Sequence, residues 1–312
     1  MNANILVTGG GGYLGSVLVP ELLAAGHKVI VVDSFMYRQN SLAAACHHPN
    51  FEVVRGDVRA EDTVMPHLRR ADIVIPLAAL VGAPLCQRDP VGATTTNHDA
   101  VLLMLKHMSR DQVVIMPTTN SAYGSGDANN QCDELSPLNP ISQYAREKVL
   151  VEQALMQHPG AISYRLATVF GMSPRMRIDL LVNDFTWRAV TDRFVVLFES
   201  HFKRNYLHVR DVARAFLHAI ANAGRMKGEI YNVGLSEANV SKKELCEIIK
   251  RQVPKFTYIE APVGKDPDQR NYIVSNAKIE ATGYKPRVSL EEGVRELIKG
   301  YRTIANSRYG NV

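Results

Sequence analysis

The sequence predicts an α/β protein, in which a doubly wound parallel sheet is followed by a smaller mixed α/β part. Short runs of apolar, β-branched residues alternate with amphipathic helical stretches through the first half of the chain, and a glycine-rich segment joins the first run to the first helix. Continuous apolar strands separated by helices indicate a parallel sheet that is buried on both faces. This alternation becomes irregular after residue 170. We therefore expect a nucleotide-binding domain over residues 1–170 and a substrate-binding part over residues 171–312.

The first domain contains six runs with strand character, separated by helical stretches. The predicted strands are Asn4–Thr8, Lys28–Asp33, Phe51–Arg55, Asp72–Pro76, Gln112–Pro117 and Ala161–Leu166. The predicted helices are Tyr13–Ala25, Leu42–Cys46, Glu61–Arg69, Val91–Met108 and Ile141–His158.

The second part has shorter strands and a less regular order, and some of its elements are expected to return to the first domain. The predicted strands are Phe194–Leu197, Asn205–Val209, Glu229–Val233 and Phe256–Ile259. The predicted helices are Ile178–Val190, Val212–Ala221, Lys242–Arg251 and Leu290–Tyr301.

Composition excludes several classes of protein. With 312 residues, 46% hydrophobic and 21% charged, the chain can bury a core and is not a disordered or collagen-like sequence. The net charge of +5 is spread along the chain, which argues against a nucleic-acid partner. The most apolar stretch, Ile73–Cys86, is too short and too interrupted by proline to span a bilayer, and the N-terminus does not resemble a secretion signal. We expect a cytoplasmic protein with four reduced, scattered cysteines and no metal site.

The glycine-rich segment is a candidate dinucleotide site. Gly9-Gly10-Gly11-Gly12-Tyr13-Leu14-Gly15 follows the first strand and opens a helix, and glycines there allow a tight turn beside a pyrophosphate at the helix N-terminus. Asp33 ends the second strand, where a carboxylate can bind a ribose 2′-hydroxyl and repel a 2′-phosphate. This favours NAD, although Arg38 lies near enough in sequence to leave NADP open.

Tyr144 and Lys148 form the candidate catalytic pair. Residues four apart share one face of a helix, and an ammonium beside a phenol stabilises the phenolate, which makes Tyr144 a usable general base near neutral pH. Thr119 lies in the polar segment that follows the fifth strand, at the sheet edge where ligands bind, and its hydroxyl can orient a substrate oxygen. A surface Tyr/Lys pair and a polar turn are the competing readings.

Together these motifs resemble the extended short-chain dehydrogenase/reductase family, in its NAD-dependent nucleotide-sugar epimerase/dehydratase branch. The matching stretches cover nearly the whole chain: Thr8–Gly15, Asp33, Gly56-Asp57, Leu77–Ala79, Asn97, Thr119–Gly124, Tyr144–Lys148, Arg165–Gly171, Arg204–Val209, Tyr231–Gly234 and Asp266–Tyr272. The resemblance implies a Rossmann sheet, NAD as cofactor and a nucleotide-diphosphate sugar, GDP- or UDP-linked, as substrate. It also implies a homodimer or homotetramer, assembled through the helices equivalent to Val91–Met108 and Ile141–His158.

The resemblance also assigns roles residue by residue. The cofactor-binding residues it implies are Gly9, Gly12, Tyr13, Leu14 and Gly15 at the pyrophosphate, Asp33 at the ribose, Asp57 and Val58 near the adenine, and Leu77, Ala78, Ala79, Asn97, Tyr144 and Lys148 along the rest of the cofactor. Tyr144, Lys148 and Thr119 are the implied catalytic residues. The substrate-binding candidates are Thr119, Asn120, Ser121, Asn183, Arg204 and Arg270, with the two arginines facing the diphosphate.

Some positions depart from the family pattern. Asn120 and Ser121 stand where the 4,6-dehydratases carry Asp-Glu, which argues against removal of water. Thr168 stands where the family has a substrate-binding asparagine, and Asn183 is a candidate replacement. Cys86 and Cys132 are weaker candidates for acid/base groups, because buried thiols are commoner. The stretches 80–86 and 170–177 are similar to those of bacterial GDP-heptose C4 dehydrogenases of capsule pathways.

We therefore expect oxidation of a sugar alcohol at C4. Tyr144 removes the hydroxyl proton, and a hydride passes to NAD. If the hydride returns on the other face, the enzyme is a 4-epimerase; if the keto sugar leaves, it is a dehydrogenase. An NADP-dependent carbonyl reductase and a non-catalytic nucleotide-binding relative are the alternatives, and the nucleotide base, the sugar and the pathway stay open.

Overall fold

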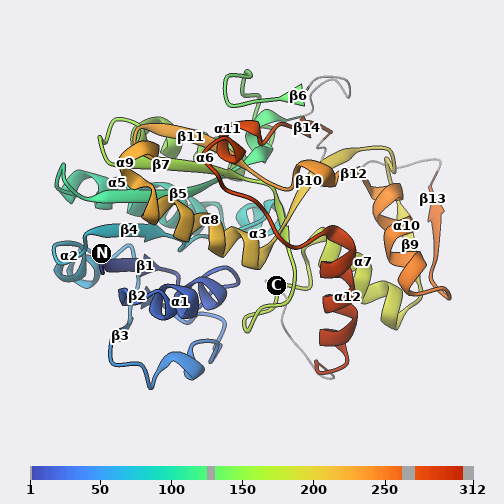
Figure 1. The fold of residues 1–312 in the computed structure, drawn as a ribbon, viewed down its shortest axis with the longest axis horizontal. Coiled ribbons are helices and arrows are strands. Elements are labelled where there is room, and N and C mark those ends of the chain that lie inside the picture. Colours follow the sequence, from blue (N-terminus) through green and yellow to red (C-terminus); the bar gives the residue numbers. More distant parts are fainter. Residues whose placement is uncertain (1, 125–130, 262–270, 305–312) are drawn as a thin grey trace.

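A computed structural model describes residues 2–124, 131–261 and 271–304, and within them a seven-stranded parallel sheet forms the centre of the molecule (Figure 1). Its strand order is β11-β7-β5-β4-β1-β2-β3, and all adjacent pairs are parallel. The strands are β1 (Asn4–Thr8), β2 (Lys28–Asp33), β3 (Phe51–Arg55), β4 (Ile73–Pro76), β5 (Val113–Thr119), β7 (Ala161–Leu166) and β11 (Glu229–Val233). This confirms the predicted doubly wound fold.

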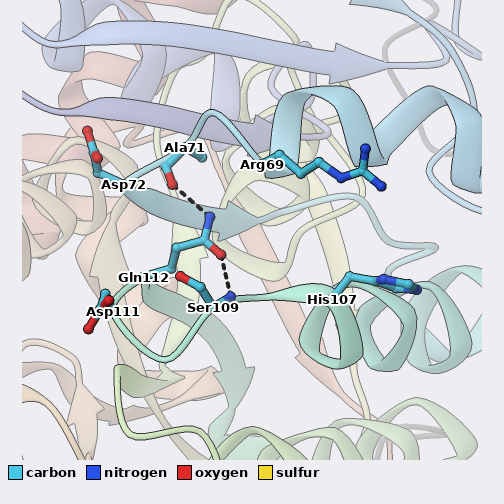
Figure 2. Close-up of a pocket in the computed structure, with 7 residues that line it drawn as sticks. All are labelled: Arg69, Ala71, Asp72, His107, Ser109, Asp111 and Gln112. Carbon is cyan, nitrogen blue, oxygen red and sulfur yellow. Dashed lines mark hydrogen bonds between the residues drawn. The ribbon is translucent and has the colours of Figure 1, made fainter.

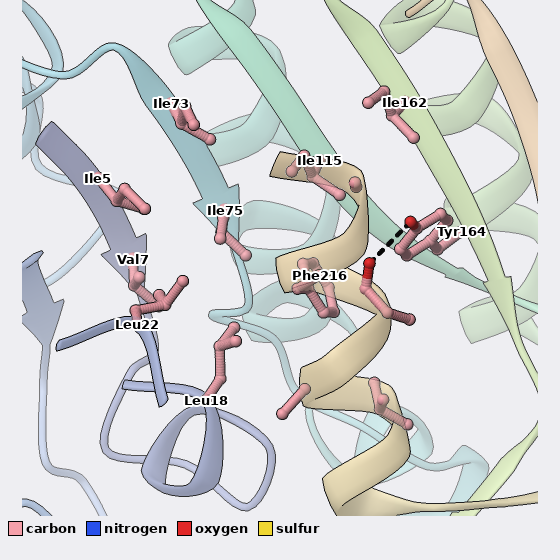
Figure 3. Packing of buried hydrophobic residues seen from close by; sticks show 14 of the residues in the cluster. Ile5, Val7, Leu18, Leu22, Ile73, Ile75, Ile115, Ile162, Tyr164 and Phe216 are labelled. Atoms are coloured by element: carbon pink, nitrogen blue, oxygen red, sulfur yellow. Dashed lines mark hydrogen bonds between the residues drawn. The ribbon is translucent and has the colours of Figure 1, made fainter. Parts of the chain in front are cut away.

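Helices cover both faces of this sheet because successive residues of a strand point to opposite sides. Ile5 and Val7 of β1 pack with α1 (Gly15–Ala24) and α8 (Val209–Ala221) in one core, which Figure 3 shows from close by. Leu6 belongs to a second core on the other face. The helices there are α2 (Glu61–Leu68), α5 (Ala100–His107) and α6 (Gln143–Leu155).

The predicted helix Val91–Met108 is instead three segments. A five-residue π-helix, η2 (Thr95–Asp99), separates α4 (Pro90–Thr94) from α5. The wider turn coincides with Asn97, whose fully buried amide accepts a hydrogen bond from Leu80 N–H and donates one to the Leu80 carbonyl. The spacing of apolar residues along the sequence does not predict this π-helix, because the wider turn accompanies a contact with Leu80, which lies outside the helix.

The smaller part of the chain contributes three short sheets. They are the three-stranded sheet of β8 (Thr168–Phe170), β10 (Lys203–His208) and β12 (Asn239–Ser241), the parallel pair β9 (Phe194–Leu197) and β13 (Thr257–Glu260), and the parallel pair β6 (Gln131–Cys132) and β14 (Ile273–Val274). A separate core joins the helices α7 (Leu181–Thr191), α10 (Lys242–Gln252) and α12 (Leu290–Tyr301). The remaining short elements are α3 (Ala83–Arg88), α9 (Ala223–Met226), α11 (Ala277–Glu280), and the 3₁₀ turns η1 (Ala43–Ala45), η3 (Asn120–Tyr123) and η4 (Ser236–Ala238).

The strand order reverses between β1 and β4, and this reversal determines where a ligand fits. β2 and β3 extend the sheet on one side of β1, while β4 lies on its other side. In such sheets the crevice opens beyond the carboxyl ends of the two central strands. The helices of the smaller part lie beyond this same edge (Figure 1). Among the described residues, none of the helices combines the length and the apolar character needed to cross a membrane.

Candidate active site

The glycine-rich turn between β1 and α1 lies directly against the end of β4. Gly9 has a left-handed backbone (φ +70°), and a Cβ placed on it would lie 2.5 Å from the backbone nitrogen of Ala78. A Cβ on Gly15 would lie 2.5 Å from the carbonyl oxygen of Gly10. Leu14 is the N-cap of α1, and its side chain makes no capping hydrogen bond. The result is a helix N-terminus that carries a partial positive charge at the crevice.

Asp33 borders this turn at the end of β2. Its carboxylate is 7% exposed and accepts hydrogen bonds from the backbone N–H of Gly11 (2.8 Å) and of Phe35 (2.7 Å). Burial raises the pKa of Asp33, and these two hydrogen bonds act in the opposite direction. Because a carboxylate offers about four acceptor positions, two stay available to ribose hydroxyls.

Five further predicted cofactor-binding residues lie along the carboxyl ends of β3 and β4. Asp57 is partly exposed, and the hydrogen bond from Arg59 lowers its pKa, while the neighbouring Val58 is buried. Leu77, Ala78 and Ala79 follow β4 and are half-buried. Two hydrogen bonds tie this segment to β1, from Leu77 N–H to the Thr8 carbonyl and from Ala78 N–H to Thr8 Oγ1.

Tyr13, although predicted beside the cofactor, also joins the glycine-rich turn to the smaller part. Its hydroxyl donates to the Gly171 carbonyl (2.7 Å), and Asn183 Nδ2 lies 3.3 Å from the same hydroxyl. Asn183 is fully buried, accepts from Gly171 N–H and donates to the Arg177 carbonyl. The Asn183 amide therefore has protein partners that hold the loop after β8.

Tyr144 and Lys148 lie one turn apart on α6, which the Ser142 side chain caps. The Lys148 ammonium is 6.0 Å from the centroid of the Tyr144 ring and donates to the Pro117 carbonyl on β5 (3.2 Å). Tyr144 packs against the cluster that contains Leu80 and Cys86. Burial lowers the pKa of Lys148 to about 8, whereas the neighbouring Cys86 and Glu147 act in the opposite direction.

Thr119 and Lys148 line one small recess between β5 and α6. The Thr119 hydroxyl caps η3: it accepts from Ser121 N–H (3.1 Å) and donates to Ser121 Oγ (2.9 Å). Asn120 and Ser121 are buried in the same turn. The structure thus brings the predicted catalytic residues to one edge of the sheet.

The two predicted diphosphate arginines differ in what is described of them. Arg204 is 4% exposed and lies on β10, between β8 and β12. Arg270 lies outside the described residues. The two cysteines considered as acid/base groups, Cys86 and Cys132, are buried, and burial raises the pKa of each thiol.

Two buried carboxylates behind the pair are functional candidates that the sequence analysis did not single out. Glu147 accepts from Thr94 Oγ1 (2.6 Å) and from Asn97 Nδ2 (3.5 Å), so it joins α6 to the π-helix. Glu152, one turn beyond Lys148, forms a buried ion pair with Arg165 of β7 (2.6 Å). The signal was present in the sequence, because Tyr144, Lys148 and Glu152 follow one another at intervals of four.

A hollow of about 330 Å³ lies at the opposite, amino edge of the sheet, and Figure 2 shows its lining. The Gln112 amide in this lining has its hydrogen bonds within the protein: Nε2 donates to the carbonyls of Leu68 and Ala71, both at 2.7 Å, and Oε1 accepts from Ser109 N–H. None of the predicted site residues lines this hollow.

Comparison with known proteins identifies the family. The family described as "NAD dependent epimerase/dehydratase" matches residues 5–234. This chain belongs to that family. It is 28% identical to UDP-glucuronic acid decarboxylase 1 of Arabidopsis thaliana, over 96% of this chain and 69% of the plant protein. This relative is named for a decarboxylation, whereas the family is named for epimerisation and dehydration, so the family name alone does not specify one reaction.

Two solved structures in the family agree with the fold. The UDP-glucose 4-epimerase of Thermus thermophilus in complex with NAD has a TM-score of 0.83 and 25% identity, covering 96% of this chain and 99% of that one. DesIV, a dTDP-glucose 4,6-dehydratase of Streptomyces venezuelae with NAD and TYD bound, has a TM-score of 0.83 and 27% identity, covering 96% and 97%.

The residues of this epimerase/dehydratase family member fit a bound NAD. A Cβ at Gly9 or Gly15 would collide with backbone, so the turn needs glycine where a pyrophosphate has to approach closely. The Asp33 carboxylate, already oriented by two N–H groups, is suited to ribose hydroxyls and opposes a 2′-phosphate. The preference for NAD over NADP predicted from Asp33 agrees with the family.

Proposed function

We propose that this enzyme oxidises the C4 hydroxyl of a nucleotide-diphosphate sugar to a ketone, with NAD as the hydride acceptor. The observation that carries the proposal is the pair on α6: the Lys148 ammonium lies 6.0 Å from the Tyr144 ring centroid, at the carboxyl edge where Thr119 also lies. A phenol with a neighbouring ammonium and an adjacent hydroxyl is suited to removing a proton from an alcohol.

NAD supplies one part of this chemistry when bound, namely acceptance of a hydride from the sugar carbon. Gly9, Gly12 and Gly15 would hold its pyrophosphate and Asp33 its adenosine ribose. Lys148 would hold its nicotinamide ribose. These assignments follow the family resemblance, and the geometry of the turn and of Asp33 supports them.

In the proposed mechanism, side chains of the protein accept the proton of the sugar hydroxyl. In the proposed step the C4 hydroxyl gives its proton to the Tyr144 phenolate, which the positive charge of Lys148 stabilises. Because burial lowers the pKa of Lys148 to about 8, this side chain is still mostly protonated at pH 7. Its hydrogen bond to the Pro117 carbonyl holds the ammonium beside the ring. Thr119 is proposed to orient the substrate oxygen.

Removal of water from the sugar is not part of the proposal. Asn120 and Ser121 offer an amide and a hydroxyl, which do not serve as acid and base near neutral pH. Two outcomes follow oxidation: return of the hydride to the other face of the ketone gives a 4-epimerase, and release of the keto sugar gives a dehydrogenase. We favour the epimerase and keep the GDP-heptose type of dehydrogenase as the alternative.

Arg204 is the proposed contact to the diphosphate of a GDP- or UDP-linked sugar, since a guanidinium matches phosphate oxygens in a bidentate manner. A homodimer or homotetramer is proposed to form through the segment of α4, η2 and α5, which was predicted as the helix Val91–Met108, and through α6. Val91 and Leu150 on these helices are 74% and 51% exposed, which supports a surface that a second copy covers.

The test is a proton NMR time course in heavy water with NAD and a panel of GDP- and UDP-hexoses and heptoses. A C4-inverted sugar without net NADH would establish an epimerase, and a 4-keto sugar with NADH would establish a dehydrogenase. Tyr144→Phe should lower turnover by about 10²–10⁴-fold while NAD binding is retained. Tyr258→Phe, at a tyrosine on β13, is the matched control and should have wild-type activity. Unchanged turnover in Tyr144→Phe would disprove the assignment of the base.

A further inference from the structure

Asn120 differs from every other polar side chain in its turn. It is 1% exposed, yet neither its Oδ1 nor its Nδ2 has a hydrogen-bond partner among residues 2–124, 131–261 and 271–304. Its neighbours are all bonded: Thr118 to Glu152, Thr119 to Ser121 and Tyr123 to Asn232. The unmet hydrogen-bonding capacity in this segment is therefore concentrated in one amide.

A buried amide without partners is unfavourable, because it loses its hydrogen bonds to water and gains none in return. Most buried polar groups in proteins are paired, so each exception calls for a ligand or an ordered water. Asn120 follows Thr119 directly and lies on η3, which packs against α6, the helix that carries Tyr144 and Lys148. The Asn120 amide therefore belongs to the turn that borders the candidate catalytic residues.

The chemistry of the amide indicates what it binds. An amide offers both a donor and an acceptor, and both are unpaired here. A phosphate or carboxylate would satisfy the N–H group alone, whereas an alcohol can accept from Nδ2 and donate to Oδ1. The amide is also neutral at all ordinary pH values, so it can bind a hydroxyl without helping to expel it.

We propose that the Asn120 amide binds a sugar hydroxyl borne by one of the two neighbours of the oxidised carbon, either directly or through a hydroxymethyl group, and that it makes the enzyme select sugars carrying this hydroxyl over their deoxy counterparts. The inference rests on the proposed function and narrows its substrate class. The neighbours of C4 are C3, which bears a hydroxyl directly, and C5, which bears the hydroxymethyl group. The hydroxyl that Asn120 selects is therefore the one at C3 or C6.

The experiment compares hydroxylated sugars with monodeoxy analogues, using wild-type and Asn120→Ala enzyme loaded with NAD. The probes are UDP-glucose, GDP-mannose, and the 3-deoxy and 6-deoxy analogues of each. Calorimetry measures binding, and the NMR assay measures kcat/KM. A site built to hydrogen-bond a hydroxyl rejects the analogue that lacks it, so wild type should prefer the hydroxylated sugar by about tenfold or more. In Asn120→Ala this ratio should fall below about threefold, because affinity for the hydroxylated sugar drops while affinity for the deoxy sugar does not.

Two further variants separate recognition from folding. Asn120→Asp keeps the shape of the side chain and the hydrogen-bond acceptor but loses the donor. Its preference for the hydroxylated over the deoxy sugar should therefore lie between those of wild type and Asn120→Ala. Asn276→Ala is the control, since it removes a buried asparagine of the smaller part. Its Nδ2 donates to Asn205 and Ser236, while its Oδ1, like the Asn120 amide, has no partner among the described residues. The preference of this variant for the hydroxylated over the deoxy sugar should equal that of wild type.

The outcomes distinguish this inference from the proposed function. An equal ratio in wild type and Asn120→Ala would overturn the inference and show that the amide binds only water, while turnover by wild type would leave the proposed function standing. If wild type neither binds nor converts these sugars or any member of the GDP- and UDP-hexose and heptose panel, the proposed function is wrong and the inference is wrong with it. If wild type loses affinity for only the 3-deoxy or only the 6-deoxy analogue, that analogue identifies the hydroxyl that Asn120 binds.

Discussion

The two edges of the central sheet differ in whether each described polar side chain finds a hydrogen-bond partner within the protein. At the amino edge, a hollow of about 330 Å³ is lined by groups such as Gln112 and Ser109 that satisfy one another (Figure 2). At the carboxyl edge, a small recess lies beside Thr119 and Lys148. This edge holds the buried Lys148 ammonium and, among the residues that the structure describes, an Asn120 amide without a hydrogen-bond partner.

On the proposed function, the site lies at the smaller of these two hollows, so we do not locate it by volume. A strand end whose polar groups are mutually bonded has little left to offer a ligand. Where a strand end has a buried charge and an unpaired buried amide, the folded protein has an unfavourable desolvation free energy, which a bound ligand can reduce by hydrogen bonding to these groups. The candidate site is therefore recognised by its unmet hydrogen bonds and its buried charge.

The largest effect on stability is expected at the carboxyl edge, in the ion pair that anchors α6. Glu152 and Arg165 have side chains only 6% and 5% exposed, and Glu152 also accepts from Thr118 and Ser163. Glu152→Gln leaves the guanidinium buried without a counter-charge, which should lower the free energy of unfolding by about 3–5 kcal/mol. Chemical denaturation measures this.

The control for this variant is an exposed pair elsewhere in the sheet. Glu52 of β3 pairs with Arg70, and their side chains are 41% and 58% exposed. Glu52→Gln should lower the free energy of unfolding by less than about 1 kcal/mol. Equal losses in the two variants would contradict the view that the carboxyl edge depends on buried charge.

A smaller, pH-dependent effect is expected from Glu296 of α12, which accepts from the backbone of Met172 near the glycine-rich turn. Burial raises the pKa of Glu296, but the close contacts of its carboxylate with His208 and Arg210 outweigh it and lower the pKa to about 2. The stabilisation is thus complete above the ordinary value of 4.5 and is lost as pH falls toward 2. This shift corresponds to about 3 kcal/mol.

Thermal unfolding as a function of pH tests this expectation. Wild type should lose stability between pH 4.5 and 2, and Glu296→Gln, which cannot titrate there, should lose less over the same interval. Parallel curves for the two proteins would show that Glu296 does not carry the acid sensitivity.

The smallest effect is expected at the amino edge. Gln112→Ala removes the amide that bonds Leu68, Ala71 and Ser109, but the hollow admits water to the groups left behind. We expect a loss of about 1 kcal/mol in the free energy of unfolding and no change in kcat/KM. A large change in kcat/KM would assign function to this edge and reverse the comparison.

Much of the fold follows from local sequence patterns. The bounds of β1, β2, β3, β7, β9 and β11 are those predicted, because each is a short run that contains β-branched or aromatic residues. The two-residue strands β6 and β14 were not predicted, since their pairing joins Gln131 to Ile273 and leaves no local period. β5 continues past its predicted end at Pro117 to Thr119, because its last residues pair with β7.

The candidate site was predictable to a lesser degree. Spacing of four residues is enough to place Tyr144 and Lys148 on one helical face, and the structure shows them so. Spacing does not show whether a side chain has a partner. That the Asn183 amide is fully bonded, while the Asn120 amide is not, depends on contacts between distant segments.

The last strand to join the central sheet has a consequence for the way this protein is synthesised. β11 ends at Val233 and pairs with β7, which ends at Leu166, so the ribosome must translate more than sixty further codons before the sheet can close. During that interval β7 is an open edge of a parallel sheet, a form that associates readily with other chains. Nascent chains paused within this stretch should therefore be those that depend most on chaperones.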